Sequence, residues 1–393
     1  MKVIRDPIHD YIELDDFTLS LTDTPEVQRL RRIRQLGFAN LVYPGANHTR
    51  FEHSLGVYHL TKQMIRQVDE YQQKELLAAA LLHDIGHGPF SHATEGIIER
   101  YTRKSHDSVE ELLKNGMISD VLKDHSLSPS SVARHIRGET YPGQIINSEI
   151  DVDRMDYLVR DAHYTGVAFG LIDHTRLIHE LRFNENKLVL NIGGLQAAES
   201  LLVSRFLMHP TVYFHHVSRI AESMCSHAAG YMIENGGLSP KIFSRMDDAT
   251  LMMEMKNAKG YPDEIASRLD ERRLFKRALY TGFDSIDDDV FKTNISRAEI
   301  EISETAGISP DHVLVDIPEK PEIPEMKAQV MINGNMIPID KASVLVSTLE
   351  KAQIDNWKLG VFTPSEYREK VGKIAREFFG VKKDTKQFKL TEL

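Results

Sequence analysis

A short run of alanine and leucine ends in a segment through which a helix cannot continue. Residues 76–82 read Leu-Leu-Ala-Ala-Ala-Leu-Leu, and His83 and Asp84 follow directly. Alanine and leucine have high helix propensity, so residues 74–84 are expected to form a helix that is buried on most sides. Two glycines and a proline then interrupt residues 86–92. The chain must therefore place a histidine and an aspartate at the end of a buried helix.

The rest of the pattern predicts a mainly α protein with a small α+β lobe at its C-terminal end. Residues 1–20 indicate short extended segments and turns, and residues 25–36 and 53–72 indicate helices. Helical patterns recur between residues 105 and 282, interrupted by a strand and turn at 187–194. Strands are expected at 312–318 and 329–339, the second pair joined by a hairpin at Asn333-Gly334, before an amphipathic stretch at 365–379 and a lysine-rich tail. We predict a core over residues 1–290 and a lobe over residues 291–393.

Composition limits the compartment and the partners. The chain has 393 residues, with 41% hydrophobic and 27% charged residues, which is typical of a globular protein. A net charge of −10 does not favour a surface that coats nucleic acid. Cys225 is the one cysteine, and no apolar run is long enough to cross a bilayer. We expect a cytoplasmic protein without a membrane or nucleic-acid partner.

Histidines gather in one part of the sequence. Seven of the 18 lie between residues 48 and 106: His48, His53, His59, His83, His87, His92 and His106. Adjacent residues on a helix point about 100° apart, so His83 and Asp84 converge on one ion only near a helix end. Imidazoles and carboxylates together suit one divalent transition metal such as Fe, Mn, Co, Ni or Zn. A metal with open positions can carry a hydroxide and polarise a phosphoryl oxygen.

Three longer motifs surround this cluster. They are Arg-Phe-Glu-His-Ser-Leu-Gly-Val from residue 50, Leu-His-Asp-Ile-Gly-His-Gly-Pro-Phe-Ser-His from residue 82, and Ile-Asp-Val-Asp-Arg-Met-Asp-Tyr from residue 150. In this order they resemble the HD-domain deoxynucleoside triphosphate triphosphohydrolases, including the catalytic core of the members that combine SAM and HD domains. The resemblance runs from residue 1 to about 230, with a weaker echo to about 350. It implies an HD-domain helical core.

The resemblance also implies roles for individual residues. The metal ligands would be His53, His83, Asp84 and Asp153, with Asp151 holding the local turn. Groups around the reacting phosphate would be His87, His92, His106 and Glu95, with His92 or His106 as proton donor. The substrate would contact Arg50, Arg154, Arg205, His209, Tyr213, Tyr157, Asp161, Gln35, Leu36 and His215. Glu95 stands where the family has Asp, Arg154 where it has Lys, and Phe214 where it has Gln.

The implied reaction converts a deoxynucleoside triphosphate to deoxynucleoside and tripolyphosphate, and leaves open an accessory Mg²⁺ on the phosphates. Because Phe214 and Pro210 depart from the family pattern, an HD-class nucleotidase or phosphodiesterase is an alternative. A nucleotide-sensing or nucleic-acid-binding protein with weak catalysis is another. Lys2, Asp23, Gln28 and Arg31 match a segment that binds a guanine-nucleotide activator between subunits, although Lys2 and Arg31 also fit a chain terminus and a surface charge. A homo-oligomer, dimer or tetramer, is therefore expected.

Overall fold

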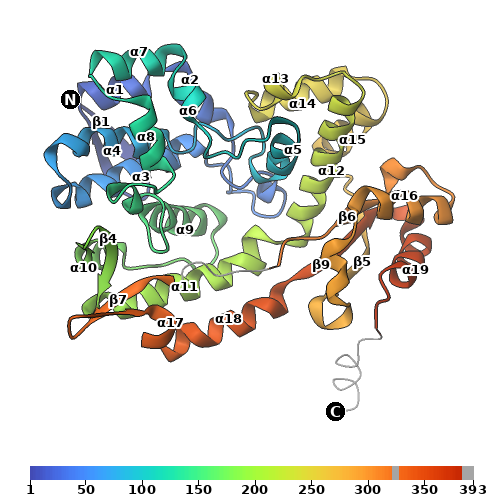
Figure 1. Cartoon of the computed structure of the whole chain (residues 1–393). Helices are drawn as coiled ribbons and strands as arrows, with labels where there is room; N and C mark the ends of the chain where they lie inside the picture. Colours follow the sequence, from blue (N-terminus) through green and yellow to red (C-terminus); the bar gives the residue numbers. More distant parts are fainter. Residues whose placement is uncertain (321–326, 383–393) are drawn as a thin grey trace.

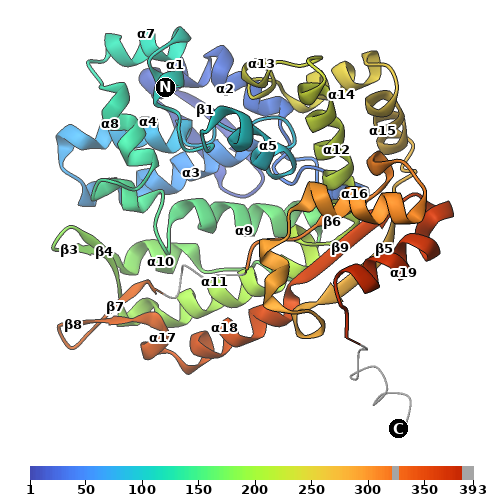
Figure 2. The ribbon, with the colours of Figure 1, turned by 45° about the vertical axis from the view of Figure 1, so that its right-hand side comes forward.

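The computed structural model describes residues 1–320 and 327–382. It is a mainly helical assembly with three small sheets at its margins (Figures 1 and 2). The helices are α1 Asp16–Thr22, α2 Pro25–Arg29, α3 Arg50–Met64, α4 Glu70–Leu82, α5 His92–Thr102, α6 Glu110–Leu113, α7 Gly116–Asp124, α8 Pro129–Ile136, α9 Val152–Thr165, α10 His174–Glu180, α11 Leu195–Met208, α12 His216–Glu234, α13 Pro240–Phe243, α14 Asp248–Asn257, α15 Tyr261–Asp270, α16 Ile295–Ala306, α17 Ile339–Ala342, α18 Val344–Asn356 and α19 Arg368–Phe378. The predicted fold class, mainly α with a small α+β lobe, is confirmed.

The strands form three separate sheets. Their bounds are β1 Lys2–Asp6, β2 Asp10–Leu14, β3 Leu181–Asn184, β4 Lys187–Asn191, β5 Lys276–Gly282, β6 Leu314–Asp316, β7 Gln329–Ile332, β8 Asn335–Pro338 and β9 Lys358–Thr363. Strands β1 and β2 make a hairpin, the second sheet has the order β3-β4-β7-β8, and the third has the order β5-β9-β6. The second sheet joins β4 and β7 in parallel, and the other pairs are antiparallel.

The predicted buried helix is α4. Ala78, Ala79, Ala80, Leu81 and Leu82 have no exposed surface, and α4 packs on α3 and α8. The helix ends at Leu82, with His83 as its C-cap. The end of the buried helix thus lies inside the largest hydrophobic core, which α3, α4, α8 and α9 build together.

Two further cores organise the rest of the described chain. One lies between α12, α14 and α15 and also receives Phe38 and Phe90 from the N-terminal half. The other fills the space between the β5-β9-β6 sheet and helices α16 and α19. Helices α11 and α18 lie side by side along the lower edge of the molecule in both views (Figures 1 and 2).

The helix expected at residues 25–36 is much shorter. Helix α2 ends at Arg29, a 3-10 turn covers Leu30–Arg32, and Ile33 is extended. Arg34 then forms a β-bridge with Thr49, so this long-range pairing overrides the local helical spacing. The helix expected at 53–72 begins earlier, at Arg50, because Thr49 and Glu52 form a capping box, and it ends at Met64.

Strand β5 lies where a helix was expected, and it pairs with β9 far along the chain. The second and third sheets therefore each combine strands from both sides of residue 290. The division into domains at that residue stays a prediction. Part of the lysine-rich tail, residues 383–393, lies outside the described residues.

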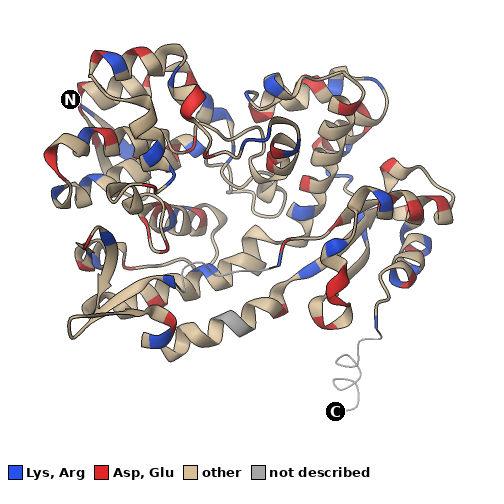
Figure 3. Ribbon diagram, viewed as in Figure 1, with Lys and Arg blue, Asp and Glu red and all other residues tan. Residues whose placement is uncertain are grey.

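Positively and negatively charged residues are interspersed along the ribbon (Figure 3). Among the described residues, no helix is long and apolar enough to span a membrane.

Candidate metal centre and active site

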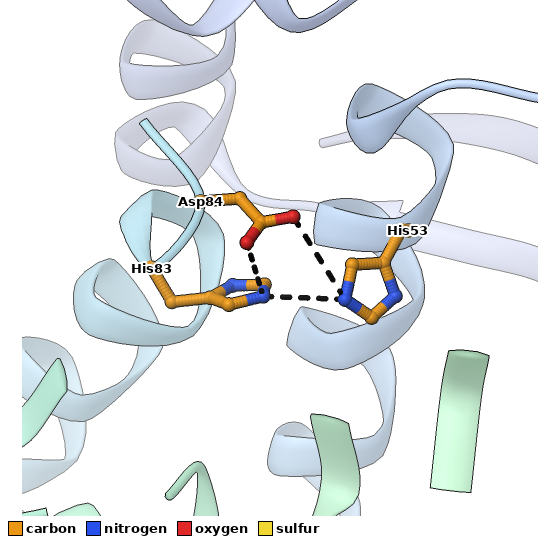
Figure 4. A group of neighbouring side chains, drawn as sticks. All are labelled: His53, His83 and Asp84. Carbon is orange, nitrogen blue, oxygen red and sulfur yellow. Dashed lines mark hydrogen bonds and ion pairs between the residues drawn. The ribbon is translucent and has the colours of Figure 1, made fainter. Parts of the chain in front are cut away.

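His53, His83 and Asp84 point toward one another from two elements (Figure 4). His53 comes from α3, and the other two follow the end of α4. The Nε2 atoms of the two histidines are 3.3 Å apart, and those of His83 and His53 lie 3.4 Å and 3.9 Å from the Asp84 oxygens. All three side chains are at least nine-tenths buried. Two imidazole nitrogens and a carboxylate therefore face one point.

Asp153 completes this arrangement from the first turn of α9. Its Oδ1 lies 2.8 Å from the Nε2 of His53 and 3.8 Å from the Nε2 of His83. The Asp153 side chain is 33% exposed, so this side of the cluster opens to solvent. Asp151 instead caps α9, because its oxygens accept the N–H groups of Arg154 and Ser148, both at 2.9 Å. The four predicted ligands thus come together, with one side open to solvent.

Both imidazoles are fixed from behind. The Nδ1 of His53 is 2.8 Å from an oxygen of Asp156, and the Nδ1 of His83 donates to the carbonyl of Ala80 at 2.9 Å. These partners occupy the Nδ1 atoms, so the Nε2 atom of each ring is the one that faces the cluster and would bind a metal ion. This is the usual second layer around a histidine that binds a metal.

The charges at the cluster also fit a cation. Burial lowers the pKa of His53, but its hydrogen bonds to Asp153 and Asp156 raise the value to about 10. Burial raises the pKa of Asp84, yet the charges of Arg50, His83 and His87 bring it well below its ordinary range. The carboxylates stay ionised at neutral pH, so a divalent cation is a suitable counter-charge. His53, His83 and Asp84 could hold a divalent metal ion.

A second group of titratable residues lies beside the cluster. The ring of His106 stacks on that of His87 at 4.3 Å, and the Nε2 of His87 lies 3.3 Å from Asp84. His106 pairs through Nδ1 with Glu95 and through Nε2 with Asp107 at 3.0 Å. Burial lowers the pKa of His106, whereas Asp107 and Glu95 raise it to about 10. His106 is therefore protonated at neutral pH.

His92 and Arg50, which also lie beside the metal cluster, differ in exposure to solvent. The His92 side chain is 71% exposed and lies 3.4 Å from Glu95. Arg50 is buried, donates to Asp84 at 2.8 Å and donates to the hydroxyl of Ser91 at 2.6 Å. Arg50, which was predicted to contact the substrate, thus donates its hydrogen bonds to a candidate metal ligand and to the neighbouring turn.

The residues expected near the sugar form a chain of contacts. Asp161 accepts a hydrogen bond from the Tyr213 hydroxyl at 2.9 Å, and its other oxygen lies 2.7 Å from the Nε2 of His48. Tyr157 lies between Tyr213 and the candidate metal ligand His53. Its ring centroid is 6.1 Å from that of Tyr213 and 6.4 Å from that of His53. Three of the predicted substrate residues therefore connect to the metal cluster.

Other predicted substrate residues lie farther out. Arg205 and His209 line a hollow between α11 and α18, and the His209 ring stacks on Phe214 at 4.2 Å. Residues His209–Tyr213 form one π-helical turn, and this turn contains Pro210, which has no N–H to continue the α-helix. His215 caps α12 and stacks on His216.

The three remaining predicted substrate residues are each held by neighbouring parts of the fold. Gln35 is buried, and its N–H donates to the carbonyl of His48 at 3.0 Å. Leu36 is half-buried against the largest core. Arg154 pairs with Asp151 and donates to the carbonyl of Ser148 at 2.9 Å.

The four residues matched to an activator site lie on the N-terminal elements. Gln28 accepts from Arg31 at 2.8 Å, and the Arg31 guanidinium lies 3.6 Å above the Phe51 ring. Lys2 is exposed on β1, and Asp23 is exposed at the end of α1. Within residues 1–320 and 327–382, neither Lys2 nor Asp23 forms a hydrogen bond or ion pair with Gln28 or Arg31.

Sequence reasoning missed the buried charges behind His53. Asp156 binds His53, lies 2.6 Å from the Nε2 of His9 and accepts from Arg160 at 2.8 Å. Arg160 in turn donates to Asp6 at 2.9 Å. The spacing of Asp153, Asp156 and Arg160 on one helix was a usable signal, whereas His9 and Asp6 gave none because they lie far away in the sequence.

The comparisons with known proteins agree with this site. A family model described as the HD domain matches residues 50–161, and one described as the HD associated region matches residues 172–390. An uncharacterised protein of Methanocaldococcus jannaschii is 34% identical over 96% of this chain and 84% of its own length. The chain belongs to the HD-domain phosphohydrolase family.

Two more similarities concern proteins with a named activity. A crystal structure of a phosphohydrolase from Bacteroides thetaiotaomicron matches with a TM-score of 0.75 and 26% identity, covering 93% of this chain and all of that one. The deoxynucleoside triphosphate triphosphohydrolase SAMHD1 of Bos taurus is 30% identical over 70% of this chain. The match covers 52% of that relative, so this chain corresponds to about half of it.

Proposed function

We propose that this protein is a metal-dependent deoxynucleoside triphosphate triphosphohydrolase. The observation that carries the proposal is the convergence of His53, His83, Asp84 and Asp153 beside a protonated His106. The similarity to SAMHD1 of Bos taurus supports deoxynucleoside triphosphates as the substrate class. The products would be a deoxynucleoside and tripolyphosphate.

The residues divide the work in this proposal. His53, His83, Asp84 and Asp153 would hold a divalent ion such as Fe, Mn, Co, Ni or Zn, which would supply Lewis acidity for a phosphoryl oxygen and for a water molecule. His106 would donate its Nε2 proton to the departing nucleoside 5′-oxygen, which would take the place of Asp107 as its partner, while Glu95 keeps its contact with Nδ1 and holds the ring. Asp161 accepts from the sugar hydroxyl, and Tyr213 fixes the orientation of that carboxylate.

The decisive experiment analyses the products. Metal-free protein is loaded separately with Mn²⁺, Fe²⁺, Co²⁺, Ni²⁺ and Zn²⁺, incubated with each deoxynucleoside triphosphate, and the products are separated by anion-exchange chromatography. The proposal requires tripolyphosphate and deoxynucleoside in equal amounts. Release of orthophosphate or pyrophosphate instead would refute it.

One observation favours a different substrate for the same centre. Phe214 stacks on His209, where the resembling enzymes have a glutamine near the base. A nucleotidase or phosphodiesterase of the HD class would need no such amide. The same chromatography, run with nucleoside monophosphates and cyclic dinucleotides, distinguishes this candidate.

Regulation by a guanine nucleotide, with a homo-oligomer as the active form, is part of the proposal. Lys2 and Arg31 offer positive charge for phosphates, and Asp23 and Gln28 offer polar groups for a guanine edge. If an activator binds between subunits, GTP must both raise turnover of dATP and favour the larger assembly. Turnover and sedimentation measured with and without GTP test this point, and equal values at saturating GTP would exclude it.

A further inference from the structure

The turn that carries the candidate catalytic residues has an unusual backbone. It follows Asp84 and leads into α5, and it contains His87 and Ser91. Phe90 and Ser91 have φ angles of 53° and 43°, although neither is glycine. Consecutive residues of this kind cost energy and persist only where the surroundings hold them. Something in the fold must therefore hold this turn.

One carboxylate of α14 contacts the turn directly. The Oδ1 atom of Asp248 accepts the N–H of Phe90 at 2.6 Å. Its Oδ2 atom accepts the N–H of Arg34 at 3.0 Å. Asp248 is 7% exposed, so both hydrogen bonds are shielded from water. A single side chain thus joins two backbone segments that lie far apart in the sequence.

Asp248 is not acting as the cap of its own helix. The preceding residue, Asp247, has that role, because its Oδ1 accepts the N–H of Thr250 at 2.9 Å. Asp247 also pairs with Arg32 at the surface. The two neighbouring acids therefore divide their tasks, with one stabilising α14 and the other turned toward the active-site segments.

Both segments held by Asp248 lead to predicted site residues. Ser91 accepts from Arg50, and Arg50 donates to the candidate ligand Asp84. Arg34 directly precedes Gln35 and Leu36. A movement of either segment would reach the metal cluster or the substrate side through these contacts.

A second side chain reinforces the same junction. Arg29 donates to the carbonyls of Ile85, His87 and Met246, each at 2.8 Å. The ring of Phe90 stacks on that of Phe38 at 4.3 Å. The turn is thus tied to the start of α14 directly through the N–H of Phe90 and, by way of Arg29, through its carbonyls, while its aromatic ring packs on Phe38.

We propose that Asp248 is a positioning residue that clamps the Phe90–Ser91 turn against the Arg34 segment and so fixes the geometry of the active site. An ionised acceptor suits this role, because hydrogen bonds to a charged group are about twice as strong as neutral ones. Asparagine would offer one oxygen and one amide, so it could accept from only one of the two N–H groups. The catalytic part of this inference rests on the proposed phosphohydrolase function.

The test compares Asp248→Asn with Asp247→Asn as a matched control on the next residue. In Asp248→Asn we expect hydrogen exchange at the Phe90 or Arg34 amide to accelerate at least tenfold. We also expect kcat to fall by about 10–100-fold with little change in KM, as for other residues behind a site. Asp247→Asn should leave both quantities near their starting values, because it loosens only the cap of α14 and the pair with Arg32 and keeps both hydrogen bonds of Asp248.

The unmodified protein provides a further check that needs no variant. The amides of Phe90 and Arg34 must already be protected from exchange, although neither lies in a regular helix or strand. Rapid exchange at both amides would overturn the clamp, and so would an unchanged kcat in folded Asp248→Asn or an equal loss in Asp247→Asn. If the protein hydrolyses no phosphate ester, the proposed function fails, while the exchange data still decide whether the clamp exists.

Discussion

The Nδ1 atom of His53 lies 2.8 Å from a carboxylate oxygen of Asp156, and both side chains are buried. This contact sets which nitrogen of the imidazole faces the cluster. It also connects the N-terminal hairpin to the candidate metal centre, because the other oxygen of Asp156 lies 2.6 Å from His9.

Replacing Asp156 should therefore weaken metal binding without removing a ligand. We expect Asp156→Asn to lower the affinity for Mn²⁺ by about 10–100-fold, as is usual when the partner of a metal-binding histidine is changed. Competition with a chromophoric chelator measures this affinity. Asp120→Asn, at an exposed position on α7, is the control. Unchanged affinity in a folded Asp156→Asn protein would contradict the assigned orientation of His53.

Removal of a ligand should have a larger effect. In His83→Ala or Asp84→Ala we expect the purified protein to lose its metal and its hydrolytic activity while it keeps its fold. Elemental analysis beside circular dichroism measures both properties. Full metal content with full activity in either variant would show that the ion binds elsewhere.

His106 should affect the chemical step more than substrate binding. We expect His106→Ala to reduce kcat by about 10²–10⁴-fold, the usual contribution of a general acid. KM should change little, since the ring stacks on His87 and pairs with two acids. His92→Ala, at a mostly exposed side chain, is the comparison. A larger loss of kcat in His92→Ala would transfer the role of proton donor to His92.

Glu95 should determine how far the activity extends to alkaline pH. Burial lowers the pKa of His106, and Asp107 and Glu95 raise it to about 10. A general acid must be protonated, so the unmodified protein keeps this proton at neutral pH and loses it only near pH 10. Glu95→Gln removes one raising charge, so the alkaline limb of the kcat profile should move to lower pH. A profile in Glu95→Gln that ends at the same pH would show that another group sets this limb.

Local patterns predicted the parts of the fold in which neighbours in sequence are also neighbours in space. The helix that became α4 was predicted to end at Asp84, where alanine and leucine give way to glycine and proline, and it ends nearby at Leu82. The hairpin of β7 and β8 was predicted because an Asn-Gly dipeptide favours a tight turn between strands. In the structure Asn333 and Gly334 both adopt positive φ, with values of 51° and 82°.

Long-range contacts explain what was missed. Ile33 has the spacing of a helical residue, but the pairing of Arg34 with Thr49 straightens the chain. Strand β5 was predicted as helix because no local pattern shows its partner. It is a strand because it pairs with β9, which lies in the C-terminal part of the chain. Asp248 follows another acid at the start of a helix, so its sequence context indicates only a cap. Its hydrogen bonds to the N–H groups of Phe90 and Arg34 arise only when these distant segments come together in the folded chain.

The strand pairings also have a consequence for synthesis of the chain. Leu190 on β4 pairs with Val330 on β7, so the second sheet is incomplete until residue 330 has left the ribosome. At roughly 5–20 residues per second, the intervening 140 residues take about 7–28 s to make. During this interval the edge of β4 offers unpaired N–H and carbonyl groups to any neighbouring strand. We expect nascent chains stalled between these residues to aggregate more readily than the finished protein.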